Sequence, residues 1–221
     1  MRPTGQMTNF APGNRGVERD PATLASHRFQ GGRDSSFFAA AVTMATRFTT
    51  HGDTLRLTVE ITNSGAGHYV PTGIPMRHML LVVRVRTGDG ADIPLIAGPV
   101  VPAWGGTGPA ATDYAGRPGK VFAKLLEDAA GNAPVAFFEA AREGPDSRIA
   151  PRATDRSEYR FLLPASPLGT VAVDAALLYR RAWKAWSDAK GWNLPDQVVA
   201  RWRGTIPRGK AAGGGAGPPA G

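Results

Sequence analysis

Residues 54–62 carry the clearest hydrophobic pattern in the chain, because apolar and polar side chains alternate along them. Leu55, Leu57, Val59 and Ile61 fall on one face, and Arg56, Thr58, Glu60 and Thr62 fall on the other. Side chains of a β-strand point alternately to opposite faces of the sheet, so this pattern predicts a strand with one buried face. The apolar residues 38–48 precede it, and His51-Gly52-Asp53 separates the two runs as a turn. Together these segments predict a β-hairpin.

Several further runs have the composition of short strands. Residues 78–86 are apolar and end at a Gly-Asp-Gly turn, and residues 93–96 are their expected partner. Further strands are expected at residues 120–126, 135–140, 157–163 and 171–180. Residues 194–202 have helical spacing at Val198, Val199 and Trp202 and predict a short helix. The whole pattern favours an all-β fold, an immunoglobulin-like β-sandwich with an irregular N-terminal arm and a short C-terminal helix.

Composition divides the chain into three regions. Residues 1–36 lack apolar periodicity and predict an irregular arm, residues 37–207 form the expected sandwich domain, and the Gly/Pro-rich residues 208–221 predict a disordered tail. The 28 glycines and 19 prolines among 221 residues favour turns and disfavour long helices. No stretch approaches the about 20 apolar residues that span a bilayer, and the first ten residues lack the apolar run of a secretory signal. By itself the chain is therefore expected to be soluble and unexported.

Charge narrows the range of partners only slightly. The formal net charge is +8, from 26 Lys and Arg residues against 18 Asp and Glu residues, and such a charge speeds the approach of anionic partners without selecting one. The arginines are scattered singly through the expected strands, which argues against a nucleic-acid-binding protein. Only Arg180, Arg181 and Lys184, interleaved with Trp183 and Trp186, form a candidate surface for docking an anion.

The histidines are the first place to look for metal chemistry. They lie at positions 27, 51, 68 and 78, and the chain contains no cysteine, which excludes disulfides and thiolate metal sites. His78 has Met76 and Met79 as neighbours, a set of ligands that suits copper, but Met79 opens a buried strand and core packing is the favoured interpretation. For His27 and His68 the residues alone leave two interpretations open. Each is either a surface or structural histidine or a ligand of a metal ion.

Hydrolytic chemistry finds little support in the sequence. Neither a Gly-x-Ser-x-Gly elbow nor a phosphate-binding Gly-x-x-x-x-Gly-Lys-Ser/Thr loop is present. Asp146 and Arg148 are expected to form an ion pair that stabilises a loop. A hydrolase would need a cleft that unites His68, Asp113 and Asp146, so we expect no enzymatic activity.

Seven short segments nevertheless occur together in a distinctive order. They are Ser26-His27-Arg28-Phe29-Gln30-Gly31-Gly32, the hairpin that ends at Thr62-Asn63, Gly67-His68-Tyr69-Val70-Pro71-Thr72-Gly73, Met76-Arg77-His78, residues 121–128, residues 146–151, and Leu178-Tyr179-Arg180-Arg181. Their order and spacing resemble the C-terminal β-sandwich region of bacterial multihaem c-type cytochromes, over residues 26–205. This resemblance implies an electron-transfer setting in the periplasm or at the cell surface.

The resemblance also implies roles for two histidines. His27 corresponds to a distal axial ligand of haem iron, and His68 is the second candidate. The chain departs from the family because Cys-x-x-Cys-His, which attaches haem c, is missing. No haem is therefore bound covalently, and haem c would come from an upstream domain of a longer protein or from a multihaem partner subunit. The implied function is that of a haem-free accessory or interaction domain that donates a distal histidine.

A second function, of a different class, stays open at this point. Immunoglobulin-like sandwiches serve many binding roles, and fold alone does not choose among them. Residues 98–119 predict a long loop with Trp104 and Tyr114 as isolated aromatics. An adhesion or scaffolding module could bind protein or carbohydrate through this loop.

Overall fold

The computed structural model describes residues 9, 13, 15–24, 35–164 and 169–207, and the chain divides into two compact units, Met1–Asp34 and Ser35–Gly221. In the first unit the short 3-10 helix η1 (Pro21–Thr23) is capped by Asp20, whose carboxylate accepts a hydrogen bond from the Ala22 amide. Much of the predicted arm, including His27, and the predicted tail 208–221 lie outside the described residues.

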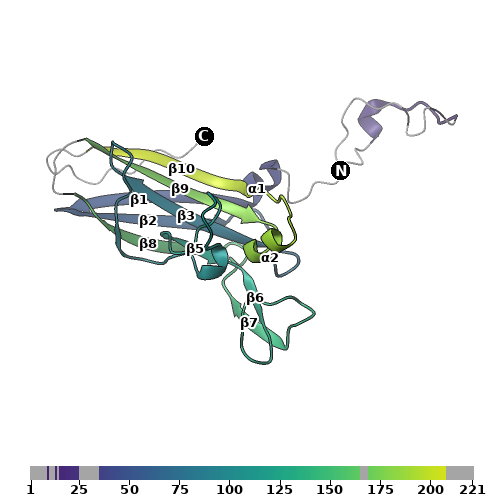
Figure 1. The fold of residues 1–221 in the computed structure, drawn as a ribbon. Coiled ribbons are helices and arrows are strands. Elements are labelled where there is room, and N and C mark those ends of the chain that lie inside the picture. The colour runs from purple at the N-terminus through teal and green to yellow at the C-terminus, as the bar shows by residue number, and fades with distance from the viewer. Residues whose placement is uncertain (1–8, 10–12, 14, 25–34, 165–168, 208–221) are drawn as a thin grey trace. The chain divides into compact units, whose positions relative to one another are not determined.

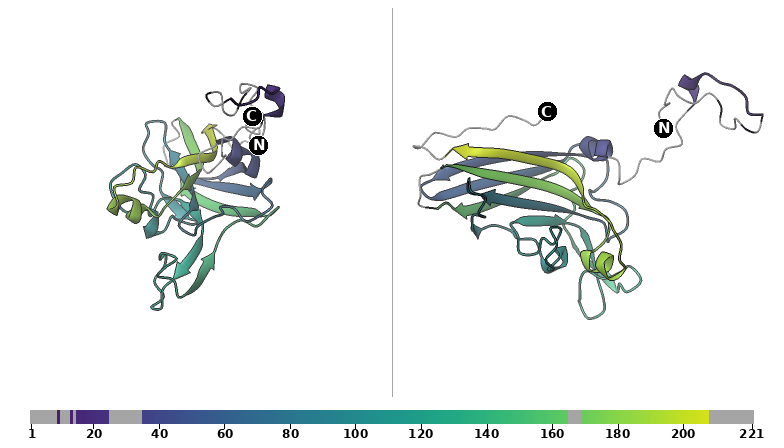
Figure 2. Two further views of the ribbon diagram at one scale, coloured as in Figure 1. Left: turned by 90° about the vertical axis from the view of Figure 1, so that its right-hand side faces the viewer. Right: turned by 45° about the horizontal axis from the view of Figure 1, so that its top comes forward.

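The second unit contains two four-stranded antiparallel sheets. The first has the order β1 (Val42–His51), β2 (Thr54–Asn63), β8 (Thr154–Leu162) and β4 (Leu95–Ala97), and the second has the order β10 (Gln197–Pro207), β9 (Thr170–Arg180), β3 (His78–Arg86) and β5 (Gly119–Phe122). Two further strands, β6 (Lys124–Glu127) and β7 (Arg142–Asp146), form a hairpin that projects from the sheets (Figures 1 and 2). The predicted β-sandwich and the predicted hairpin of β1 and β2 are confirmed.

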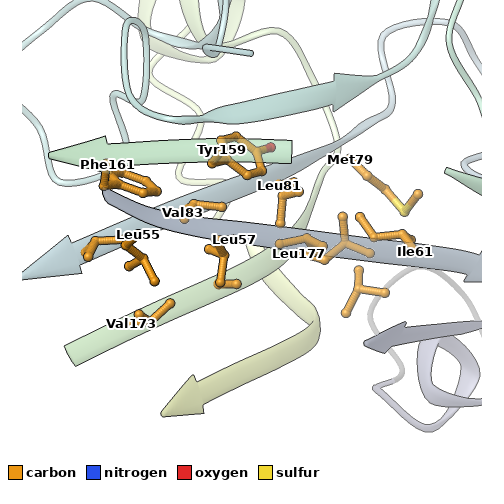
Figure 3. Packing of buried hydrophobic residues seen from close by; sticks show 14 of the residues in the cluster. Leu55, Leu57, Ile61, Met79, Leu81, Val83, Tyr159, Phe161, Val173 and Leu177 are labelled. Carbon is orange, nitrogen blue, oxygen red and sulfur yellow. The ribbon is translucent and has the colours of Figure 1, made fainter. Parts of the chain in front are cut away.

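The core lies between the two sheets, and the alternation that opened the sequence analysis builds half of it. Leu55, Leu57, Val59 and Ile61 of β2 are fully buried, while the intervening polar residues are not. They share one cluster with residues from β3 and β9, such as Leu81 and Leu177 (Figure 3). Burial of each such side chain stabilises the fold by roughly 1.5–3 kcal/mol.

A second apolar cluster lies on the outer face of the second sheet. Leu80 and Val82 of β3 and Leu178 of β9 point away from the main core and are still buried. They are covered by residues 98–118, which include the 3-10 helix η2 (Ala103–Gly105), and by the helix α2 (Lys184–Ala189). Because β3 is buried on both faces, its sequence is a continuous apolar run rather than an alternating one.

Three predicted strands were wrong in part. Residues 38–41 belong to helix α1 (Ser35–Ala41), whose Phe38 packs against Tyr179. Residues 93–96 do not pair with β3 beyond the bond from the Ile93 amide to the Val85 carbonyl, because β4 pairs with β8. Residues 120–126 break at Ala123 into β5 and β6, which belong to different sheets.

Two further predictions were wrong outright. Residues 135–140 form a turn, in which Phe137 and Phe138 are exposed, so their apolar character does not come from a sheet face. Residues 197–202 belong to strand β10, and a β-bulge between Val198 and Ala200 shifts its alternation, which gives a spacing that imitates a helix. The predicted short C-terminal helix does exist, but as α2. No described helix is long and apolar enough to cross a membrane.

Candidate functional site

Four segments meet at one end of the sandwich, which we call the loop end. They are residues 64–77, residues 123–150 with the β6–β7 hairpin, residues 181–196 with α2, and helix α1 (Figure 1). The strand pairing fixes this placement, since the end of β2 and the beginning of β3, the end of β9 and the beginning of β10 all lie there. The loop end also holds His68, within residues 64–77, and His78, the first residue of β3.

Asn63 shapes the first part of this loop. Its side chain is fully buried, its Nδ2 donates to the His68 carbonyl at 2.8 Å and to the Ile149 carbonyl at 3.2 Å, and its Oδ1 accepts from the Ala66 amide at 3.1 Å. Val70 and Ile149 exchange two backbone hydrogen bonds of 2.9 Å. Buried polar atoms are normally hydrogen-bonded, and those of Asn63 find their partners in this loop and at Ile149. These hydrogen bonds therefore fix the conformation of the loop.

His68 lies on the outer side of this loop. Its ring is exposed, and its Nδ1 lies 3.0 Å from the Tyr69 carbonyl oxygen. A carbonyl can only accept, so Nδ1 is the donor in this contact, and Nε2 is the ring nitrogen that could bind a metal ion. The segment Gly67–Gly73 therefore presents an exposed imidazole whose Nδ1 donates a hydrogen bond to the backbone.

Next to His68, the ring of Tyr69 lies against an ion pair that the sequence analysis predicted. The Arg148 guanidinium lies 5.1 Å from the Tyr69 ring centroid and donates from Nε and Nη2 to Asp146 at 2.9 and 2.7 Å. These hydrogen bonds lower the pKa of Asp146 and raise the pKa of Arg148. The expected ion pair of Asp146 and Arg148 is confirmed, and Tyr69 is a neighbour of this pair that the sequence analysis had not singled out.

His78 lies on the inner side of the loop end. It is fully buried, stacks on Trp183 with ring centroids 4.6 Å apart, and meets Trp104 edge-on at 5.6 Å. Its Nδ1 donates to the Met76 carbonyl at 2.9 Å, while Nε2 has no hydrogen-bond partner. Burial is the main reason that its pKa falls from 6.5 to about 3. This environment agrees with core packing, the interpretation that the sequence favoured for His78.

Arg180 completes the inner side. Its guanidinium is 4% exposed and binds Asp196, 8% exposed, through two hydrogen bonds of 2.8 Å. It also donates to the carbonyls of Gly105 and Thr112, at 2.9 and 2.6 Å, so it ties the cover of the second cluster to the sheet. Because the Arg180 guanidinium is buried and hydrogen-bonded within the protein, it cannot bind an anionic partner.

In the rest of that basic cluster Arg181 is half-buried and its Nε has no hydrogen-bond partner, whereas the other members are engaged. Trp183 is buried, Trp186 packs on the second cluster, and the Lys184 ammonium lies between Asp113 and Asp188. The anion surface expected at residues 180–186 is therefore wrong for Arg180 and Lys184, which pair with carboxylates beneath or within the cover of the second sheet. Trp104 and Tyr114 belong to the same layer, so the loop 98–119 lacks the free aromatics on which the adhesion module depended.

The remaining predicted residues are spread apart. His27 lies outside the described residues, and His51 ends β1 at the opposite end of the sandwich. Asp113 pairs with Lys184 and the Ala110 amide, and Asp146 pairs with Arg148. In the part of the chain that the structure describes, no group of three or more His, Asp or Glu residues could hold a metal ion.

Exposed apolar side chains concentrate at the loop end. Of the large ones in the second unit, seven lie there: Phe37, Tyr69, Ile74, Phe137, Phe138, Trp192 and Val198. Phe137 and Phe138 were assigned to a strand by the sequence and missed as surface residues, although the neighbouring prolines, glycines and alanines gave no alternating pattern to support that strand.

Haem fits these residues in one way. The chain has no thiol to attach it, and the space between the sheets is filled by the core side chains. The exposed His68 ring could instead meet a haem carried by another polypeptide segment. His78 cannot, because its ring is enclosed by Trp104 and Trp183.

Comparison with known proteins gives one structural relationship. No protein-family model matches the sequence, and no curated protein sequence matches it significantly. The penta-heme cytochrome c552 from Thermochromatium tepidum matches the structure with a TM-score of 0.60 and 21% sequence identity, over 80% of this chain and 42% of that chain. The chain resembles a multihaem cytochrome in its fold. It spans less than half of that protein's length, and at this identity the match establishes the fold alone.

Proposed function

We propose that this chain is a haem-free interaction domain of a multihaem cytochrome electron-transfer system, and that it presents a distal histidine to haem held by a partner or by a further domain. The single observation that carries the proposal is the exposed imidazole of His68 on a loop that Asn63 and Ile149 hold in place. The fold match to a penta-heme cytochrome supports the setting. The partner is a multihaem c-type cytochrome, and the compartment is the periplasm or the cell surface.

In this proposal the chain's own residues position one nitrogen. Tyr69 O accepts from Nδ1, so Nε2 of His68 is the atom that would bind iron. When bound, haem would supply the one-electron chemistry, and His68 would be one of the residues that hold it. The Arg148–Asp146 pair lies against the ring of Tyr69, the residue whose backbone carbonyl accepts from His68. His27 remains the other ligand candidate, from the sequence resemblance.

Absorbance spectroscopy tests the proposal. The chain is mixed with a purified multihaem cytochrome encoded beside it, and the spectrum is compared for wild type, His27→Ala, His68→Ala and His51→Ala. We expect a low-spin bis-histidine spectrum with wild type and with His51→Ala, and its loss in His68→Ala. Loss in His27→Ala alone would assign the ligand to His27 instead of His68. A spectrum that is the same for all four proteins would overturn ligand donation.

A further inference from the structure

The loop that joins β6 to β7 carries two adjacent aromatic side chains on its surface. Phe137 is 63% exposed and Phe138 is 72% exposed, and their ring centroids lie 5.3 Å apart in a T-shaped arrangement. The hairpin that carries them projects from the two sheets (Figures 1 and 2). Two phenylalanines in water cost free energy that a folded domain normally avoids, so their exposure needs a reason.

Hydrogen bonds hold this pair in place. The Glu139 amide donates to the Ala136 carbonyl at 3.0 Å, and the Ala136 amide donates to the Glu139 carboxylate at 3.2 Å, which closes a turn with both phenylalanines at its centre. Ala136 itself is buried. On either side, the Val135 amide bonds Leu126 O and the Ala141 amide bonds Glu127 O. The aromatic pair is thus pre-organised, and a partner would lose little conformational entropy in binding it.

Charge around the pair is low because most of the charged groups are paired. Lys124 bonds Glu143 and Arg142 bonds Glu127 in the stem of the hairpin. Within residues 128–141 the charged groups are Asp128, which binds Asn132, and Glu139, which closes the turn. This loop contains no cation, which disfavours an anionic membrane as the occupant and favours an apolar pocket in a protein.

The stem of the hairpin is attached directly to the loop of His68. Ser147, after β7, bonds Ala123 before β6 through amide and hydroxyl contacts of 2.9 and 3.0 Å. The next residue, Arg148, lies over Tyr69, and Ile149 pairs with Val70. A polypeptide that reaches His68 from outside therefore approaches the flank of the same hairpin.

We propose that the turn of Phe137 and Phe138 is the docking knob for the haem-bearing polypeptide that His68 faces, and that both rings insert into an apolar pocket of that polypeptide. This inference rests on the proposed function for the identity of the partner. His68 selects the haem, whereas the phenylalanine pair supplies most of the affinity, as buried aromatic anchors do in protein interfaces.

Photo-crosslinking in cells of the organism that carries the gene tests the inference. Phe138, Tyr69 and, as a control at the opposite end, Leu162 are each replaced by p-benzoyl-phenylalanine, and covalent adducts are stained for haem peroxidase activity in denaturing gels. Haem c stays attached to its protein in such gels. We expect a haem-staining adduct from positions 138 and 69 and none from position 162.

The other outcomes separate the two proposals. A haem-staining adduct from position 69 alone leaves the proposed function standing and overturns the docking role of the hairpin. No haem-staining adduct from either position overturns both. An adduct of twice the chain's mass without haem stain assigns the knob to a second copy of this chain and also overturns the inference.

A binding measurement with the captured cytochrome gives the second readout. Phe137→Ser/Phe138→Ser should weaken binding roughly 30-fold or more, because hot-spot aromatics contribute that much at interfaces. Ile96→Ser, which removes an apolar side chain of β4 that is 51% exposed, should leave binding unchanged. Equal affinities of the two variants would contradict the docking role.

Discussion

The inner and outer sides of the loop end use the same residue types for opposite purposes. On the inner side His78 is enclosed by Trp104 and Trp183, and burial lowers its pKa to about 3. On the outer side His68, ten residues earlier, is exposed and lies beside Tyr69. The difference teaches that a histidine near a cytochrome-like motif is a ligand candidate only where the fold leaves its ring accessible.

The largest expected effect concerns the buried ion pair of the inner side. Asp196→Ala should lower the free energy of unfolding by about 3–5 kcal/mol, because it leaves the buried Arg180 guanidinium without its carboxylate. Urea unfolding measures this change. Asp92→Ala removes the partner of Arg86 at an exposed site and should cost at most about 1 kcal/mol. Equal costs would break the distinction between the buried ion pair of the inner side and an exposed one.

The pH dependence of stability should come next in size. The pKa of His78 is 6.5 when unfolded and about 3 when folded, so between these values the unfolded chain binds one more proton. Stability contributed by neutral His78 is complete above pH 6.5 and falls as the pH drops, by about 1.4 kcal/mol per pH unit, until about pH 3. His78→Phe should remove this part of the slope in urea unfolding between pH 7 and 4. Met79→Leu, a core change without a titrating group, should retain the slope, and a slope shared by all three proteins would refute the assignment.

Asn63 should give a smaller, local effect. Asn63→Ala removes three hydrogen bonds that hold the His68 loop and should cost about 1–3 kcal/mol. Hydrogen exchange should show faster exchange of the amides of residues 66 and 70. Asn132→Ala, which removes exposed contacts with Asp128, should leave those amides unchanged. Unchanged exchange in Asn63→Ala would mean that other contacts fix the loop.

The smallest effect on stability is expected at His68. His68→Ala should change the free energy of unfolding by less than about 0.5 kcal/mol, because the ring is exposed. In the proposed function the same variant loses a haem ligand, so function and stability separate. A loss of several kcal/mol, measured by urea unfolding, would instead make His68 a structural residue like His78.

Much of the sandwich could be predicted from the sequence. Where a strand has one buried face, as β2 has, alternation of Leu55, Leu57, Val59 and Ile61 identified both the strand and its core side. Prediction failed where tertiary context changed the period. The bulge in β10 imitated a helix, and the exposed Phe137 and Phe138 imitated a strand, because a short apolar run does not say what it will pack against.

The site could be predicted only as far as local sequence defines it. The loop motif around His68 is one short segment, and Asp146 and Arg148 are two residues apart. Each feature is local in the sequence, so its role could be inferred. The contacts of Arg180 with Asp196, Gly105 and Thr112 depend on two loops that fold over the second sheet. The contact between Tyr69 and Arg148 joins residues far apart in the chain. No spacing rule reveals such pairs.

Hydrogen exchange of the chain alone and with the haem-staining partner tests the central claim most directly, that the outer side of the loop end receives a haem-bearing polypeptide. We expect slower exchange on binding within residues 64–70 and 135–142, and no change within residues 87–92 at the opposite end. Protection confined to residues 87–92, or found in neither region, would contradict the claim.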